Sequence, residues 1–283
     1  MGILDRLKTG LVLTKDSLLV MRHHPKLFLF PVISGIAGLA FLVTFLGLTF
    51  GVAAVAPQEA TLIVLVPLYF ILTFISTFFA AALVHQTRSA LSGGEVDLRE
   101  GVAAAWDRKV PLAIWSIIAA VVGAIINGLQ NSDSTASRGI GTAFAIAWTV
   151  ATFFVVPVIV FERAGTFEMF KRSGSEFKST WGETTISLVG VQVVSFVVAL
   201  PFALIGLAFY PISVIITIAF VLAGALASFL VSQTLQGVIK TTLYLYSTEG
   251  VEPEEFENVD FEGLAKDRKG GAKTAPTGGF VGK

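Results

Sequence analysis

The chain contains no cysteine and only three histidines, and charged residues make up 14% of its 283 residues. Without cysteine it has no disulfide, no thiolate metal ligand and no cysteine nucleophile. Lys+Arg and Asp+Glu balance at 20 each, so the basic excess that neutralises nucleic-acid phosphates is missing. Soluble domains carry about 25% charged residues, whereas this chain is 54% hydrophobic. We therefore expect a lipid bilayer as the main solvent, and neither a nucleic-acid partner nor a cofactor.

Six uncharged apolar segments are each long enough to cross a bilayer, because about 20 helical residues span its ~30 Å hydrocarbon core. They lie at 27–50, 61–84, 111–130, 140–161, 184–206 and 211–236. Only four residues separate the last two segments, which predicts a tight helical hairpin whose second arm begins at Pro211. The sequence thus predicts an all-α fold, a polytopic transmembrane helix bundle of six spans in one membrane domain, 1–246.

The positive charges predict the orientation of these spans. Of the 20 Lys and Arg residues, 19 lie before the first span, in 85–110, in 162–183 or after 236, and the other loops contain only Arg138. Loops on the cytoplasmic side retain positive charge. We therefore expect a multi-pass protein of the cell membrane with both the N and C termini in the cytoplasm, which agrees with the even number of spans.

Three amphipathic segments, at about 3–22, 97–108 and 166–181, precede successive pairs of spans. Asp97 with Glu100 three residues later resembles a capping box at the start of the second one. The sequence thus predicts three cytoplasmic surface helices, each followed by a hairpin of two spans. Such helices either anchor the spans at the membrane surface or present a lipid-sensing or partner-binding face.

Three short segments resemble a known group of proteins. They are VFERAG at 160–165, EMFKRS at 168–173 and KSTWG at 178–182. They are similar to a family of uncharacterised six-span prokaryotic integral membrane proteins, mainly archaeal, whose layout is similar to that of the membrane domain beside some glycerophosphodiester phosphodiesterases. The resemblance implies the architecture; it implies no reaction, because the chain contains no catalytic phosphodiesterase portion.

Four polar residues flank the ends of spans on the expected cytoplasmic side: His85, Arg88, Glu162 and Arg163. If the hairpins pack side by side, these groups form a site at head-group level where Arg88 and Arg163 bind a phosphate. The alternative is that they are ordinary interface residues whose charged ends reach the water. We find no motif for catalysis or for a metal site, and the chain is not expected to be an enzyme.

The candidate polar contacts inside the membrane are Asn127, Gln192 and Gln233. Such residues either bridge neighbouring helices by hydrogen bonds or line a substrate path. Proline residues within the spans are compatible with kinked, gating helices; they are Pro67, Pro157 and Pro201. After about Ser247 the chain becomes polar and rich in glycine, which predicts a disordered cytoplasmic tail over 247–283.

These observations leave three function classes. The leading interpretation is a non-catalytic protein that organises the membrane or interacts with lipids or a protein partner, through its surface helices or tail, because this role needs nothing that the sequence lacks. The alternative is a small permease or facilitator that uses the kinked spans. The third is an enzyme acting on lipid head groups, which requires His85, Arg88 and Glu162 to converge.

Overall fold

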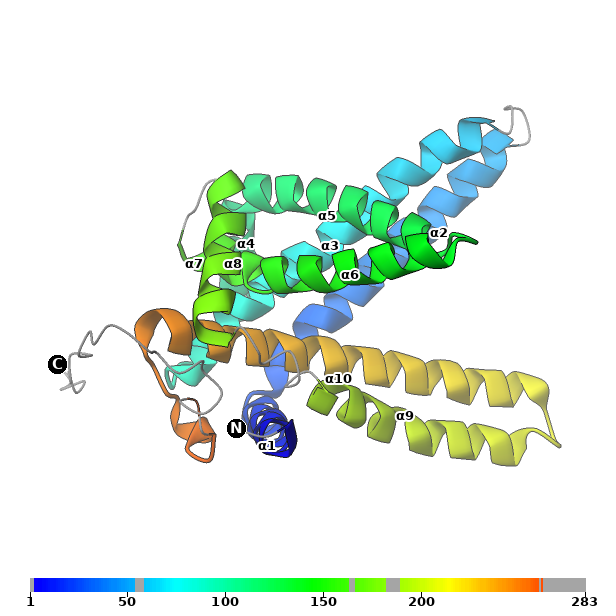
Figure 1. The fold of residues 1–283 in the computed structure, drawn as a ribbon. Helices are drawn as coiled ribbons and strands as arrows, with labels where there is room; N and C mark the ends of the chain where they lie inside the picture. The colour runs from blue at the N-terminus through cyan, green and yellow to red at the C-terminus, as the bar shows by residue number, and fades with distance from the viewer. Residues whose placement is uncertain (1–2, 54–58, 163–165, 182–188, 260, 262–283) are drawn as a thin grey trace.

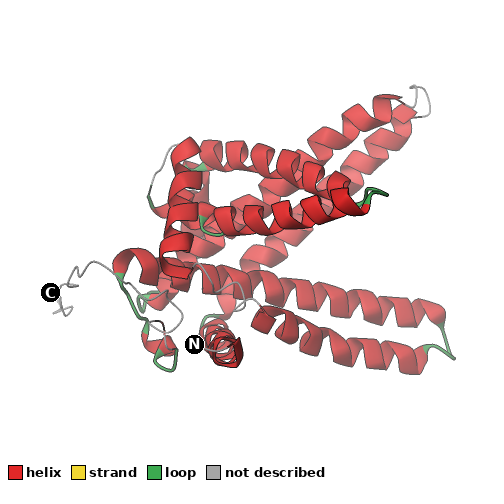
Figure 2. Ribbon diagram, in the orientation of Figure 1, coloured by secondary structure: helices red, strands yellow, loops and turns green. Residues whose placement is uncertain are grey.

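A computed structural model describes residues 3–53, 59–162, 166–181, 189–259 and 261. Within these ranges the chain forms helices joined by turns and loops, with no strand (Figure 2). The elements are α1 (Ile3–His23), η1 (Pro25–Phe28), α2 (Leu29–Ala53), α3 (Glu59–Leu91), α4 (Leu98–Asp107), α5 (Lys109–Gln130), α6 (Thr135–Thr152), α7 (Val155–Phe161), α8 (Thr166–Trp181), α9 (Val189–Phe209), α10 (Val214–Glu249) and η3 (Glu254–Phe256). The predicted all-α fold class is confirmed.

Six helical stretches are long and apolar enough to cross a membrane. They are Pro25–Gly47, Pro67–Leu91, Lys109–Gln130, Thr135–Phe161, Gly190–Phe209 and Val214–Glu249. They form three hairpins, α2–α3, α5–α6 and α9–α10, whose tips point away from α1, α4 and α8 (Figure 1). The short helices therefore gather at one end of the bundle, which we call the charged end, and α3 is central, because it contacts α2, α4, α5, α7 and α10.

The packed core lies near the charged end rather than midway along the spans. Its largest fully buried side chains come from helices distant in sequence, for example Leu13 of α1, Phe154 of the fourth span and Tyr244 of α10. By contrast, in the most apolar 18-residue stretch of each helix, only 11% of the residues of α9 and 6% of those of α10 are buried inside the protein. Lipid chains solvate such apolar surface as well as a protein core does, so the hairpins extend into the bilayer without needing to cover each other.

Close backbone contact holds the α9–α10 hairpin together. A Cβ added to Gly224 would lie 2.6 Å from Cβ of Phe202, so the residue has to be glycine for the helices to approach this closely. The hydroxyl of Ser228 donates to the carbonyl oxygen of Ser195 across the same interface, at 2.7 Å. The predicted hairpin forms, but Pro211 lies in the turn, and α10 starts one turn later because Ser213 caps its N-terminus.

The fourth span is interrupted, although the sequence predicts one helix over 140–161. Helix α6 ends at Thr152 and α7 begins at Val155. At the break, the backbone N–H of Phe154 donates to Oγ of Ser173 in α8, at 3.0 Å, and both residues are fully buried. The surface helix thus supplies the acceptor that the interrupted span needs, because an unpaired N–H is costly in a buried setting.

The other surface helices also pack on the ends of spans. Asp97 caps α4 as predicted, accepting from the N–H groups of Arg99 and Glu100 at 2.6 and 3.1 Å. The N–H of Asp97 itself donates to Oε1 of Gln86 in α3, at 2.8 Å. In a capping box, the side chain of Glu100 would accept the N–H of Asp97. Here the side chain of Gln86, in the preceding span, accepts it instead.

The first part of the predicted tail is ordered. Helix α10 continues to Glu249 and ends at Gly250, whose φ of 66° lies in the left-handed region that glycine adopts at helix ends. Beyond it, Phe256 is buried and the ring of Phe261 stacks on Tyr246 with centroids 4.7 Å apart. The segment around η3 packs against α1, so the prediction of a disordered tail is wrong for residues 247–259, and residues 262–283 lie outside the described part.

Candidate functional site

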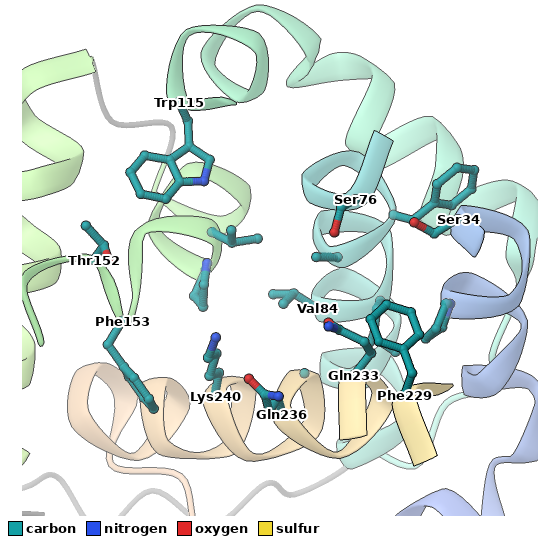
Figure 3. A pocket seen from close by; sticks show the side chains of 17 residues that line it. Ser34, Ser76, Val84, Trp115, Thr152, Phe153, Phe229, Gln233, Gln236 and Lys240 are labelled. Atoms are coloured by element: carbon teal, nitrogen blue, oxygen red, sulfur yellow. The ribbon is translucent and has the colours of Figure 1, made fainter. Parts of the chain in front are cut away.

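A cavity of about 260 Å³ lies between α2, α3, α5, α6, α7 and α10. Its volume is just below the ~300–1,000 Å³ of pockets that hold drug-sized ligands. The polar groups that line it are Ser34, Ser76, Trp115, Thr152, Gln233, Gln236 and Lys240. The rest of the lining is apolar, so the cavity has a polar region within hydrophobic walls (Figure 3).

One face of α10 supplies three of the polar groups. Gln233, Gln236 and Lys240 are three and four residues apart, the spacing that places side chains on one side of a helix. In Figure 3 all three project from α10 into the cavity, opposite the indole of Trp115. The cavity is therefore built by the end of the sixth span facing the third and fourth spans.

Among the described residues, Lys240 is the only cationic side chain that lines this cavity. Its Nζ lies 5.5 Å from the centroid of the Phe153 ring, a cation–π contact. Among the described residues, no carboxylate lies within ion-pair distance of this ammonium. Its positive charge therefore lacks a protein counter-ion in this part of the chain.

The depth of Lys240 follows from the length of α10. The helix has 36 residues, or roughly 54 Å, against the ~30 Å hydrocarbon core that about 20 residues cross. Counted from Val214, that crossing ends near Thr234, so Lys240 lies about 9 Å further along the helix. Helix geometry therefore places Lys240 beyond a crossing that begins at Val214, and Phe229 within it.

Several hydrogen-bonding groups in the cavity have no partner among the described residues. They are the side chains of Ser34, Ser76, Trp115 and Gln233. Other span hydroxyls, such as that of Thr73, donate to the carbonyl oxygen four residues earlier, and the amide of Gln236 donates to Oγ of Ser232 at 3.2 Å. The unpaired groups face the space in Figure 3, where they are available to a ligand.

An aromatic cluster positions Trp115. Its ring stacks on Trp148 of α6 with centroids 5.8 Å apart, and Phe170 of α8 packs against both rings at 5.5 and 6.0 Å. Met169 beside it is fully buried. The apolar face of this surface helix therefore contacts protein, and it fixes the side chain that forms one wall of the cavity.

The residues predicted as a head-group site lie near one another but pair with other groups. Arg88 forms an ion pair with Glu249 at the end of α10, at 2.9 Å, and its guanidinium lies 5.0 Å from the ring centroid of Phe161. Glu162 accepts from Arg172 and from the hydroxyl of Tyr244.

His85 lines the same open depression as Arg88, together with Arg108, and Arg163 lies outside the described residues. Within the described residues, His85, Arg88 and Glu162 form no hydrogen bond with one another.

The surface charges near Glu162 hold α8 in place. Arg172 pairs with Glu168 in its own helix at 2.6 Å as well as with Glu162. Arg172 donates hydrogen bonds to both carboxylates. These bonds, of which those to Glu168 have the larger effect, raise the pKa of the Arg172 guanidinium above its ordinary value. The arginine therefore stays charged and joins the surface helix to the end of the fourth span.

The three residues predicted to make polar contacts inside the membrane lie in different surroundings. Gln233 lines the cavity. Asn127 is exposed near the end of α5 and accepts from the side chain of Asn131 at 2.7 Å, while Gln192 is exposed at the start of α9. Neither bridges two spans within the described residues.

Sequence reasoning missed Lys240, which it counted among the charges that follow the last span. The available signal was its helical register with Gln233 and Gln236.

The fold and the cavity define an all-helical, multi-pass membrane protein with six span-like helices and a polar pocket at its charged end. Residues 59–253 match a family of unknown function, DUF6159, and because this is more than half of the chain, the protein belongs to that family. No curated protein and no solved structure matches the chain. The six apolar helices fit the expected six-span architecture; the archaeal origin and the likeness to the phosphodiesterase-associated domain stay predictions.

Proposed function

We propose that this protein is a non-catalytic membrane protein that holds a lipid molecule in the leaflet next to its charged end. The observation that carries the proposal is the cavity of about 260 Å³, which combines the polar groups around Lys240 with apolar walls. A lipid likewise combines a polar head group with apolar chains, which favours it over a wholly polar solute.

The cavity wall continues into the lipid-facing surface. Phe229 lines the cavity and is 48% exposed, and Leu222 and Leu226 on the same helix are exposed at 63% and 52%. Across the cavity, α6 also exposes large apolar side chains, among them Ile140 and Ile146. A lipid with its head group in the cavity therefore finds apolar protein surface for its chains on both flanking hairpins.

The proposal includes the orientation expected from the sequence. Lysine and arginine gather at the charged end. This favours placing the charged end, together with both termini, on the cytoplasmic side of a cell membrane. The bound lipid then belongs to the cytoplasmic leaflet. The proposal also includes a protein partner on the surface helices or the tail. It further includes a prokaryotic, mainly archaeal origin.

Lipid retention after detergent extraction tests this function. We expect native mass spectrometry of the detergent-washed wild-type protein to show one lipid per chain that survives washing. Ser76→Trp fills the cavity and should abolish retention, whereas Ile215→Trp, at a position 80% exposed on α10, should retain the lipid. Circular dichroism and gel filtration check that both variants fold. A wild-type chain that emerges without lipid would refute the proposal.

A permease is the second candidate, favoured by the place of one helix break. Phe153 and Pro157, at the interruption of the fourth span, both line the cavity. Breaks of this kind occur where transporter helices surround a substrate site. The test is uptake of a solute into proteoliposomes. If the wild type supports uptake and Ser76→Trp does not, the function is transport and not lipid holding.

A further inference from the structure

The cavity contains a positive charge and several donors, and the described part of its lining contains no acidic side chain. Lys240 brings an ammonium with three donor hydrogens, and the indole of Trp115 brings an N–H without a partner. Trp115 as a whole is only 8% exposed. Both donors open onto the cavity without a protein acceptor among the described residues, so they favour a ligand that is negatively charged and rich in acceptor oxygens.

The amides and hydroxyls extend this donor set. Gln233 has an unpaired side-chain amide, and the hydroxyls of Ser34 and Ser76 face the same space. A carboxylate has two acceptor oxygens, whereas a phosphate diester has two oxygens that share one negative charge and two further ester oxygens. The number of donors around one cavity of about 260 Å³ therefore suits a phosphate better than a fatty-acid carboxylate.

The depth of the cation matches that of a lipid phosphate. Lys240 lies about six residues, or ~9 Å, past the end of the hydrocarbon crossing, at the level where phosphate groups lie. Lysines at this depth normally extend toward water, but this one is turned inward beside Phe153. Arg88, at the same end of the bundle, is already neutralised by Glu249, and among the described residues that line the cavity, Lys240 is the cation available to an anion.

We propose that Lys240 is the counter-charge for the phosphate of an anionic amphiphile whose head group occupies this cavity. Trp115 and Gln233 donate to the phosphate oxygens, and the acyl chains leave past Phe229 toward the bilayer. The inference rests on the proposed function and specifies the chemical class of the lipid that the site selects. Low dielectric between the helices strengthens the ion pair relative to one in water.

Three variants isolate the charge. Lys240→Met removes the ammonium and retains a long side chain, and Lys240→Arg preserves the charge. Lys109→Met is the matched control, because Lys109 is an exposed lysine at the same end of the bundle whose Nζ lies 4.6 Å from the ring centroid of Trp106, outside the cavity.

Binding is measured by native mass spectrometry of the full chain in detergent, titrated with phosphatidylglycerol, with phosphatidylcholine and with inorganic phosphate. We expect phosphatidylglycerol to bind wild type and Lys109→Met equally within twofold, and Lys240→Met at least tenfold more weakly, because a charge-assisted hydrogen bond is lost. Lys240→Arg should retain most of the affinity. Phosphatidylcholine, which carries no net charge, should bind at least fivefold more weakly than phosphatidylglycerol.

Inorganic phosphate distinguishes an amphiphile from a free anion. We expect it to compete with phosphatidylglycerol only at concentrations at least a hundredfold higher, because it lacks the chains that contact the flanking hairpins. Equal potency of the two would overturn the assignment to a lipid. Equal binding of phosphatidylglycerol by Lys240→Met and Lys109→Met would overturn the role of the lysine.

The outcomes separate this inference from the proposed function. If the wild type retains a lipid without regard to its head group, the cavity holds lipid and the selection by Lys240 is wrong. If the wild type retains no lipid, both proposals fail. Should Lys240→Met fold poorly, Trp115→Phe retains an aromatic side chain, although a smaller one, and removes the N–H, and we expect it to weaken phosphatidylglycerol binding about threefold more than phosphatidylcholine binding.

Discussion

Replacing Ser173 by alanine removes the acceptor for the Phe154 N–H at the break in the fourth span. The donor and acceptor are 3.0 Å apart and both residues are 0% exposed. The alanine side chain has no oxygen, and the position is buried, so the N–H is left buried and unsatisfied. The expected cost is about 1–3 kcal/mol of unfolding free energy, the penalty for a buried donor that loses its partner.

The measurement is the unfolding free energy in mixed micelles, titrated with a denaturing detergent and followed by tryptophan fluorescence. Ser175→Ala is the matched control, because Ser175 lies in the same helix and is exposed. Exposed positions of this kind change stability by about 0.5 kcal/mol or less. Because α8 also carries Phe170 against Trp115 and Trp148, we expect the fluorescence of the folded Ser173→Ala protein to shift as the aromatic cluster loosens.

Equal stability of the two alanine variants would refute this reasoning. It would mean that the Phe154 N–H finds another acceptor when the hydroxyl is gone, and that the surface helix does not stabilise the interrupted span through this bond. A loss confined to the unfolding free energy, with unchanged fluorescence, would place the effect at the break and not in the aromatic cluster.

Three further outcomes are expected. Gly224→Ala should destabilise the protein by about 1–3 kcal/mol through overpacking against α9, whereas Gly35→Ala, where nothing lies within 4 Å of the added Cβ, should be neutral or stabilising by up to ~1 kcal/mol; detergent unfolding measures both. Hydrogen bonds from the backbone of Glu100 and then Arg99 lower the pKa of Asp97 below its ordinary 3.8, so its contribution is present above that pH and lost as the pH falls through the lower folded pKa. The thermal stability of the wild type should therefore fall more steeply below about pH 3.8 than that of Asp97→Asn, and parallel curves would contradict this. The chain has no native cysteine, so single cysteines can be introduced and labelled. A cysteine at Arg138 should be labelled from outside the cell, and one at Lys171 only after the membrane is permeabilised. The reverse pattern would invert the proposed orientation.

The fold was largely predictable because its signals are local. An uncharged apolar run of about 20 residues has few alternatives to a membrane-crossing helix, and the cap at Asp97 depends on residues two and three positions away. The break at Phe153 and Phe154 was not predictable in this way. It is stabilised by Ser173, 19 residues later, and no pattern within the span indicates that partner.

The candidate site was predicted only in part. Gln233 was identified as a polar residue in a span, but its role depends on the space beside it, which other helices create. The predicted cluster of His85, Arg88 and Glu162 lies at the expected end of the bundle. Its charges are engaged by Glu249, Arg172 and Tyr244, whose proximity no local spacing reveals.

The sequence by itself determined the solvent of this protein, the number of its span-like helices and the end of the bundle at which its cations gather, because each depends on composition and on distance along one helix. It placed Lys240 only among the cations that follow the last span. Only the tertiary structure decided that this lysine points into a cavity and not toward water. The physical reason is that the direction of a side chain at a helix end depends on which neighbouring helices leave room for it, and that packing is set by residues far away in the chain.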